Sequence, residues 1–359
     1  MEKSINKVHT WLTLLLKVNK GRLSNVWECI HKTSGLRFAA KIVNKRNLSP
    51  KDEDLVYQEV SMLSQIRNGP TSLSGLIEFF DEDTRFYIVL DFAEGGDLLT
   101  ALVQKQKLNE MEAKLLAKSL LDGLVHLHEK KICHRNLKPE NLVLKDAQDM
   151  STVVVIDFGM AARVLQDADG DPLNLTERCG TAMFMAPEVI AQIPYDTQAD
   201  MWSFGVLMFY VLTGVHPYED AERHALYLKI CKNEYSFHPM EWQGVSKTAK
   251  RFVANLLHTD PEVRMTAEEC LAHSWLAEFL PPPPAPPPEL LPSPSKSEPQ
   301  VNKPASSSKL KGVWRVMKRR KGSVDESENM DDWKSTSSKT TSLLSSNVTG
   351  GSDRHSNSK

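Results

Sequence analysis

The amino-acid sequence predicts an α+β protein with two lobes, followed by a C-terminal tail of different composition. Short apolar runs separated by polar turns dominate residues 10–92, as in a β-rich lobe. Apolar residues at helical spacing dominate residues 93–279, which predicts a larger helical lobe. Residues 280–359 are rich in Pro, Ser and Lys and cannot bury enough apolar area to offset their ordering entropy, so we expect a disordered tail.

Each lobe is predicted from its own run of elements. In the first lobe, strand-like runs cover Trp11–Val18, Ser24–Ile30, Arg37–Val43 and Phe86–Phe92, and one helical pattern covers Leu55–Ile66. In the second lobe, helical patterns cover Ala113–His128, Met201–Leu212, Lys247–Leu257 and Thr266–Leu276. A β-rich lobe followed by a helical lobe suits a ligand-binding cleft between the two.

Charge and cysteine content narrow the class of protein. The net charge of −2 gives no argument for binding nucleic acid. The five cysteines are scattered without a paired or metal-binding spacing, as in the reduced thiols of an intracellular protein. The apolar run Trp11–Val18 is far shorter than the roughly 20 residues of a membrane span. We therefore expect a cytoplasmic protein, with access to the nucleus left open.

Two motifs in the first lobe are candidates for binding phosphate. Asn19-x-Gly21-x-x-Ser24-x-Val26 lies between two strand-like runs, and a glycine there lets backbone N–H groups approach phosphate oxygens. An ordinary hairpin turn remains the alternative for this segment. Lys41 lies inside an apolar strand, where a buried ammonium needs a partner, and Glu59 on the following helix is the natural candidate. A solvent-facing strand residue is the alternative for Lys41.

The second lobe carries a longer ordered series of motifs. The series runs His134-Arg135-Asn136-Leu137-Lys138-Pro139-Glu140-Asn141, Asp157-Phe158-Gly159, Cys179-Gly180-Thr181, Ala186-Pro187-Glu188, Asp200 and Arg264. With these motifs and with phrases such as Phe38-Ala39-Ala40-Lys41-Ile42, residues 10–279 resemble a eukaryotic protein kinase domain. They are most similar to the calcium/calmodulin-dependent (CaMK) group of Ser/Thr kinases. The resemblance implies the bilobal protein-kinase fold and binding of Mg·ATP between the lobes.

The resemblance also implies roles for individual residues. Lys41, held by Glu59, would contact the α- and β-phosphates, Lys138 would neutralise the γ-phosphate, and Asn141 and Asp157 would hold magnesium. The remaining implied ATP contacts are the loop residues Asn19, Gly21 and Ser24, the adenine contacts Val26, Ala39 and Val143, the gatekeeper Leu90, and the hinge from Asp91 to Ala93.

Asn136 departs from the pattern of the family, which has its catalytic aspartate at this position. An amide can position a substrate hydroxyl, but it has essentially no basicity and cannot accept the proton. Two functional classes therefore remain open. One is a pseudokinase or very slow kinase that binds Mg·ATP and acts as an ATP-dependent signalling scaffold. The other is an active Ser/Thr kinase that transfers phosphate to protein substrates despite Asn136.

Further elements concern regulation and partners. The resemblance implies that Arg135 pairs with a phosphate on the activation segment, for which Thr176 is the candidate acceptor. Residues 308–324 predict a basic amphipathic helix around Trp314 that suits Ca²⁺–calmodulin, with a membrane surface, nuclear import or a solvated charge run as alternatives. The run Pro281–Pro288 suits SH3 or WW modules, or serves as a passive spacer.

Overall fold

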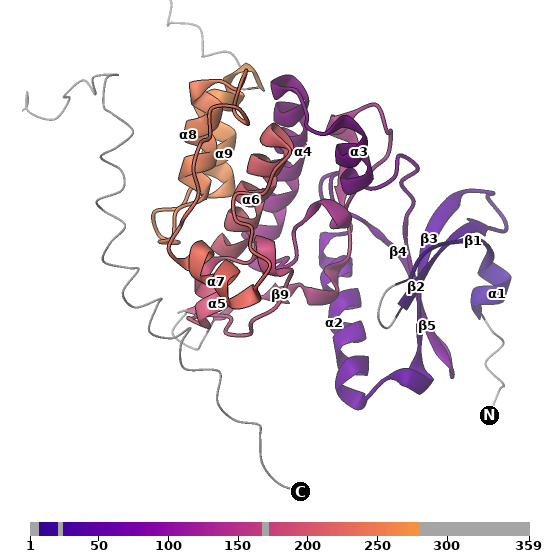
Figure 1. Cartoon of the computed structure of the whole chain (residues 1–359). Helices are drawn as coiled ribbons and strands as arrows, with labels where there is room; N and C mark the ends of the chain where they lie inside the picture. Colours follow the sequence, from indigo (N-terminus) through magenta and orange to yellow (C-terminus); the bar gives the residue numbers. More distant parts are fainter. Residues whose placement is uncertain (1–6, 21–23, 167–171, 280–359) are drawn as a thin grey trace, which may run out of the picture. The chain divides into compact units, whose positions relative to one another are not determined.

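The computed structural model describes residues 7–20, 24–166 and 172–279, and its elements form two lobes (Figure 1). Gly21, the tail from residue 280 onward and its predicted calmodulin-binding segment 308–324 lie outside the described residues. In Figure 1 the sheet strands lie on one side of the molecule with helix α2, and the other long helices are grouped in the second lobe. The predicted β-rich and helical lobes are confirmed.

The first lobe is built on a five-stranded antiparallel sheet in the order β1-β2-β3-β5-β4. Its strands are β1 (Leu12–Lys20), β2 (Ser24–His31), β3 (Arg37–Asn44), β4 (Leu76–Asp81) and β5 (Arg85–Asp91). Strand β4 was not predicted. The register pairs Val26 with Lys41 and Ala39 with Leu90, which places the residues predicted to contact ATP on adjacent strands.

The predicted start of the first strand was wrong by one residue, because Trp11 ends a short helix, α1 (Lys7–Trp11), and the strand begins at Leu12. The Trp11 ring packs against the rings of His31, Phe38 and Phe80, at centroid distances of 4.5, 5.7 and 5.8 Å. This aromatic contact keeps the helical turn against the sheet, and an apolar run alone does not distinguish it from a strand.

Helix α2 (Pro50–Ile66) begins with a capping box in which Ser49 and Asp52 bond each other's backbone N–H groups, and Pro50 occupies the first turn. These signals fix where the helix starts and hence which residues face the sheet. Val56, Glu59, Leu63 and Ile66 are its buried residues, at the spacing of one helical face. Glu59 is thereby the charged residue of α2 that points into the lobe.

The second lobe contains helices α3 (Leu98–Lys105), α4 (Glu110–Glu129), α5 (Pro187–Ala191), α6 (Gln198–Thr213), α7 (Arg223–Cys231), α8 (Lys247–Leu256) and α9 (Ala267–Ala272). Short strand pairs join β6 (Ile132–Cys133) to β9 (Ala162–Arg163), β7 (Leu142–Leu144) to β8 (Val153–Val155), and β10 (Leu165–Gln166) to β11 (Pro172–Leu173). A capping box of Thr266 and Glu269 begins α9. The helix predicted over Thr266–Leu276 ends at Ala272, because His273 is extended and a 3₁₀ turn follows.

A shared apolar core holds the second lobe together. Fourteen residues of α6 are buried, including Trp202, and α4 buries nine residues against the same core.

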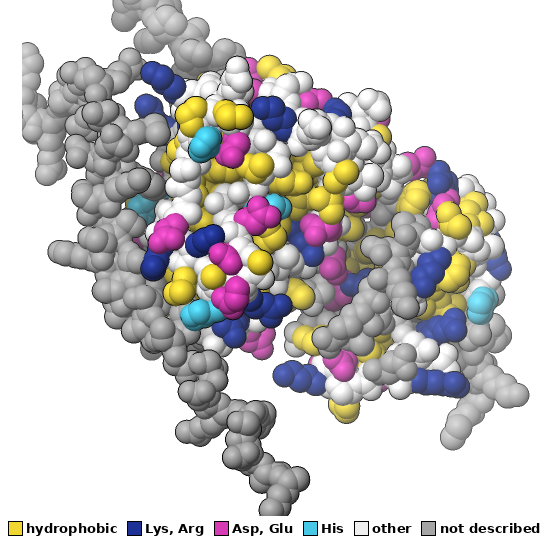
Figure 2. Space-filling model, in the orientation of Figure 1, with side chains coloured by type: hydrophobic (Ala, Val, Ile, Leu, Met, Phe, Trp, Pro, Cys, Tyr) yellow, Lys and Arg dark blue, Asp and Glu magenta, His cyan; other side chains and the backbone are white. Residues whose placement is uncertain are grey.

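On the face shown in Figure 2, Lys and Arg side chains are interspersed with Asp and Glu. Within residues 7–20, 24–166 and 172–279, no helix combines the length and apolar character that a membrane span requires.

Candidate functional site

Three charged residues from separate elements meet between the sheet and the helical lobe. The Nζ atom of Lys41 on β3 lies 2.6 and 2.9 Å from the Glu59 carboxylate on α2 and 3.1 Å from Oδ1 of Asp157. Burial opposes the charged form of Lys41, but the charges of Glu59 and Asp157 outweigh it and raise the pKa of Lys41. Burial likewise opposes the charge on Asp157, whereas Lys41 lowers its pKa overall. The predicted pairing of Lys41 with Glu59 is confirmed.

The backbone of Asp157 is in the left-handed region, with φ of 63°. This turn sends its carboxylate toward Lys41 while the next side chain, Phe158, is buried. The Phe158 ring meets the buried His134 ring edge-on at a centroid distance of 5.1 Å. The segment that carries Asp157 is therefore anchored to the loop that begins at His134.

Asp200 of α6 holds the backbone of the loop that begins at His134. Its carboxylate is completely buried and accepts hydrogen bonds from the backbone N–H groups of His134 (2.8 Å) and Arg135 (2.9 Å), and its Oδ2 lies 3.2 Å from Nε2 of His128. Burial opposes its charge, but these hydrogen bonds and the nearby histidines lower the pKa of Asp200. Asp200 thus stays ionised and braces the loop that begins at His134.

The following residues form a small network of amides and a hydroxyl. Nδ2 of Asn141 donates to the backbone carbonyl of Asn136 at 2.8 Å, and Oγ1 of Thr181 donates to Oδ1 of Asn136 at 3.3 Å. Nζ of Lys138 lies 3.7 Å from Glu140. Of the predicted second-lobe site residues, Asn136 and Asn141 are in direct contact, and Lys138 lies between them along the chain.

Oxygen atoms of this network suit a magnesium ion. Asn141 uses its amide nitrogen for the bond to Asn136, and within the described parts of the chain no donor reaches its Oδ1. Asp157 uses Oδ1 for Lys41 and its carboxylate also accepts a hydrogen bond from the backbone N–H of Gly159, yet the side chain stays 42% exposed. Mg²⁺ is commonly held by one or two oxygen ligands of this kind together with substrate phosphates. The side chains present therefore fit the predicted metal, and the ligand roles of Asn141 and Asp157 stay predictions.

The residues predicted to surround adenine come from four strands and the segment after β5. Ala39 pairs with Leu90 across β3 and β5, and Val143 lies on β7 opposite Val154. The backbone N–H of Asp91 is bonded to Gly75, whereas that of Ala93 has no hydrogen-bond partner among the described residues. An adenine ring needs a backbone N–H donor for its ring nitrogen and a backbone carbonyl acceptor for its amino group. Gly21 lies outside the described residues, and of Asn19 only the backbone, paired with Val26, is described.

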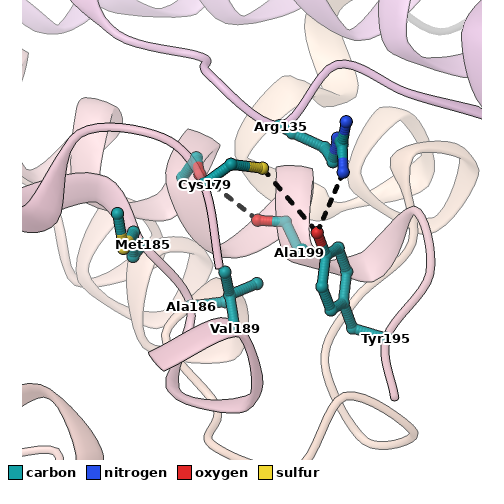
Figure 3. A pocket seen from close by; sticks show the side chains of 8 residues that line it. Arg135, Cys179, Met185, Ala186, Val189, Tyr195 and Ala199 are labelled. Carbon is teal, nitrogen blue, oxygen red and sulfur yellow. Dashed lines mark hydrogen bonds between the residues drawn. The ribbon is translucent and has the colours of Figure 1, made fainter. Parts of the chain in front are cut away.

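Arg135 organises a contact that the sequence did not predict (Figure 3). Its Nη1 lies 3.4 Å from the Tyr195 hydroxyl and 3.4 Å from Oε2 of Glu177, and its Nε donates to the carbonyl of Met160. The Tyr195 hydroxyl in turn donates to the carbonyl of Glu177 at 2.7 Å. The surrounding cavity has a volume of about 10 Å³, room for about one water molecule. No local sequence pattern marks Tyr195 or Glu177, because their contacts with Arg135 depend on the path of the chain between residues 157 and 188.

A buried ion pair holds the C-terminal end of the segment of residues 157–188. Arg264 donates to both carboxylate oxygens of Glu188, at 2.7 and 3.0 Å, and also to the carbonyls of Gln198 and His258. Both side chains are almost fully buried. The pair joins α5 to the loop before α9.

Residues 13–276 match the protein kinase domain family. The chain is 33% identical over 258 residues to calcium/calmodulin-dependent protein kinase cmkB of Emericella nidulans, covering 71% of this chain and 63% of that protein. It is 32% identical over 261 residues to calcium/calmodulin-dependent protein kinase type I of Schizosaccharomyces pombe (73% and 77%), and 33% identical over 262 residues to serine/threonine-protein kinase H1 of Homo sapiens (73% and 60%). The chain thus spans less than two thirds of two of these relatives. It belongs to the protein kinase family, and its relatives include calcium/calmodulin-dependent Ser/Thr kinases.

Proposed function

We propose that this chain is a CaMK-like protein kinase homologue that binds Mg·ATP and transfers phosphate very slowly or not at all. In this proposal it acts as a signalling scaffold whose conformation depends on ATP. The observation that carries the proposal is a fully paired Lys41–Glu59–Asp157 cluster in the same chain as Asn136. Kinases need the Lys–Glu pair and the metal-binding aspartate in place to hold Mg·ATP. They need a carboxylate to accept the proton of the substrate hydroxyl.

The proposed nucleotide contacts follow the implied roles. Lys41 would bind the α- and β-phosphates, Lys138 the γ-phosphate, and Asn141 and Asp157 the magnesium ion, which neutralises the phosphate charge when bound. Leu90 and Ala39 lie across the sheet from each other where the adenine would rest, and the free N–H of Ala93 would bind its edge. These contacts require no group that the site lacks.

The weak step is proton transfer at Asn136, which stands where the family has its aspartate. A positioned general base contributes about 10²–10⁴-fold, and kinases turn over at roughly 1–100 s⁻¹. Loss of the base alone predicts a rate on the order of 10⁻⁴ to 1 s⁻¹. Phosphoryl transfer depends mainly on positioning and electrostatics, which this site retains, so slow residual transfer is compatible with the proposal.

The second candidate function is an active Ser/Thr kinase. The observation that favours it is the order of the site: Asn136 is fixed by Thr181 and Asn141, and Asp157 already faces Lys41. A site assembled in this way would orient ATP and a substrate hydroxyl without further rearrangement. The two candidates differ in the rate of transfer and not in nucleotide binding.

Partners and location form a separate part of the proposal. We propose a protein substrate or signalling partner at the kinase domain of residues 10–279, Ca²⁺–calmodulin at residues 308–324, and SH3 or WW modules at Pro281–Pro288, in the cytoplasm. Two of the similar proteins are named as calcium/calmodulin-dependent, which supports the calmodulin part. A peptide of residues 308–324 should then bind calmodulin below ~1 µM in calcium and lose binding in EGTA. Equal binding in both conditions would refute this part.

The nucleotide part is tested by thermal unfolding with Mg·ATP, comparing the wild-type chain with Lys41→Met and assaying γ-phosphate transfer on the same samples. Ligand near 100 Kd should stabilise the wild type by roughly 2.7 kcal/mol. We expect this shift to vanish in Lys41→Met and transfer to be slow or absent. Transfer at an ordinary kinase rate would favour the second candidate. Absence of both shift and transfer would refute nucleotide binding.

A further inference from the structure

The side chain of Asn136 is held with its two polar atoms in different environments. Its carbonyl oxygen Oδ1 accepts a hydrogen bond from Thr181 at 3.3 Å. Its amide nitrogen Nδ2 forms no hydrogen bond to any acceptor within residues 7–20, 24–166 and 172–279. The whole residue is only 7% exposed. The side chain therefore offers N–H donors, and not a free acceptor, to whatever occupies the adjoining space.

Thr181 reaches Asn136 because of the glycine before it. Gly180 has φ of +102°, and a Cβ atom there would lie 2.7 Å from the carbonyl oxygen of Arg135. Only glycine lets the segment lie directly on the loop backbone at this point. Beyond Thr181, the carbonyl of Phe184 accepts a hydrogen bond from the buried Ser203 of α6 at 2.8 Å. The backbone on both sides of Thr181 is thus fixed, which limits where its hydroxyl can lie.

The backbone of Asn136 is fixed as well. Its carbonyl accepts from Nδ2 of Asn141 at 2.8 Å, and its N–H donates to Nδ1 of His134 at 3.4 Å. Nε2 of His134 lies 3.1 Å from the carbonyl of Ile156, so the neutral tautomer with a proton on Nε2 satisfies both contacts. With its backbone and Oδ1 engaged, Asn136 has little freedom to turn its amide over.

The neighbouring groups indicate which acceptor the amide meets. Asn141, bonded to Asn136, is one of the two proposed magnesium ligands, and a magnesium ion held there would neutralise charge on the phosphates of bound ATP. Lys138, the proposed γ-phosphate contact, lies two residues further along the chain. A terminal phosphate held by these groups would bring anionic oxygens close to Nδ2 of Asn136. Hydrogen bonds to charged acceptors are roughly twice as strong as neutral ones.

We propose that Asn136 donates a hydrogen bond from Nδ2 to the terminal phosphate of bound ATP, with Thr181 as the residue that positions the amide. This inference rests on the proposed binding of Mg·ATP. An aspartate at position 136 would present acceptors and a negative charge to the phosphate and would repel it. In this inference Asn136 not only lacks the basicity of an aspartate but also makes the site favour ATP over ADP.

The test is a calorimetric titration of the full chain with Mg·ADP and with the magnesium complex of β,γ-methylene-ATP, which keeps the terminal phosphate but does not transfer it. Asn136→Ala should weaken binding of the analogue by about tenfold and leave ADP binding unchanged, since it removes one charge-assisted donor. Asn136→Asp should weaken the analogue further through repulsion. Equal ratios of analogue to ADP affinity in the wild type and Asn136→Ala would overturn the inference.

Thr181 variants separate positioning from a merely structural role. Thr181→Val should lower the ratio of analogue to ADP affinity by about threefold, and Thr181→Ser, which keeps the donor, should restore it. Unchanged ADP affinity in both variants controls for folding. An unchanged ratio in Thr181→Val would contradict the positioning role. If the wild type binds ADP through Lys41 but the ratio of analogue to ADP affinity is equal in all variants, only this inference is refuted. If the wild type binds neither nucleotide, the proposed binding of Mg·ATP is refuted as well.

Discussion

Nζ of Lys41 lies 2.6 Å from Oε1 of Glu59, in an ion pair whose two side chains are 14% and 6% exposed. The pair joins the central strand β3 to helix α2, and Asp157 extends it to the helical lobe. Removing the charge of Glu59 would leave the buried ammonium of Lys41 without its nearest partner. The lobes are thus connected by the same side chains that the proposal assigns to nucleotide binding.

The first prediction concerns Glu59→Gln, which keeps the shape of the side chain and removes its charge. Lys41 then loses the partner that raises its pKa and fixes its ammonium, so we expect Mg·ATP affinity to fall by about tenfold in calorimetry. Asp54→Asn, an exposed position on the same helix, serves as the control and should leave the affinity unchanged. Equal Mg·ATP affinities in Glu59→Gln and Asp54→Asn would show that nucleotide binding does not depend on the ion pair.

The second prediction concerns the buried pair of Arg264 and Glu188. Arg264→Ala leaves the Glu188 carboxylate buried without its partner, so the free energy of unfolding should fall by about 3–5 kcal/mol in urea denaturation. Lys118→Ala, which removes a half-exposed partner of Asp122 on α4, should cost less than about 1 kcal/mol. A similar small loss in Arg264→Ala would show that the pair does not anchor α5.

The third prediction concerns the Tyr195 hydroxyl, which accepts from Arg135 and donates to the carbonyl of Glu177. Tyr195→Phe removes these two hydrogen bonds and the contact of the hydroxyl with Sγ of Cys179 at 3.8 Å. We therefore expect a loss of about 1–2 kcal/mol in stability and faster proteolysis between residues 157 and 188. Tyr227→Phe is the matched control, because its hydroxyl forms no hydrogen bond within the described residues. Unchanged cleavage in Tyr195→Phe would mean that Arg135 does not hold the segment.

The fourth prediction concerns pH. Burial lowers the pKa of His216, whose ring stacks on Tyr210 at 4.4 Å, despite the nearby carboxylates of Glu219 and Glu140. The unfolded chain then binds a proton below about pH 6.5 that the folded chain does not, so the free energy of unfolding falls as the pH decreases through this range. His216→Phe keeps the stacking and should fall less between about pH 7 and pH 5. Identical slopes in both proteins would contradict this assignment.

The sequence predicted those features that depend on local chemistry. A lysine inside an apolar strand requires a carboxylate, and Glu59 is the residue that the structure places beside it. The helical spacing of apolar residues predicted the body of α2 over Leu55–Ile66, whereas its start at Pro50 was not predicted. The contact of Thr181 with Asn136 joins residues 45 positions apart, and it depends on the path of the backbone past Gly180. Strand β4 and the helical turn at Trp11 escaped prediction because tertiary packing decides them.

The most direct test of the account is γ-phosphate transfer under single-turnover conditions, with wild type and Asn136→Asp measured side by side on a generic Ser/Thr peptide substrate and by autophosphorylation. We predict that the wild type is slow or inactive and that Asn136→Asp gains about 10²-fold or more, because the new carboxylate can accept the substrate proton in a site that is otherwise assembled. An ordinary kinase rate in the wild type, or no gain in an Asn136→Asp variant that still binds Mg·ADP, would contradict the account.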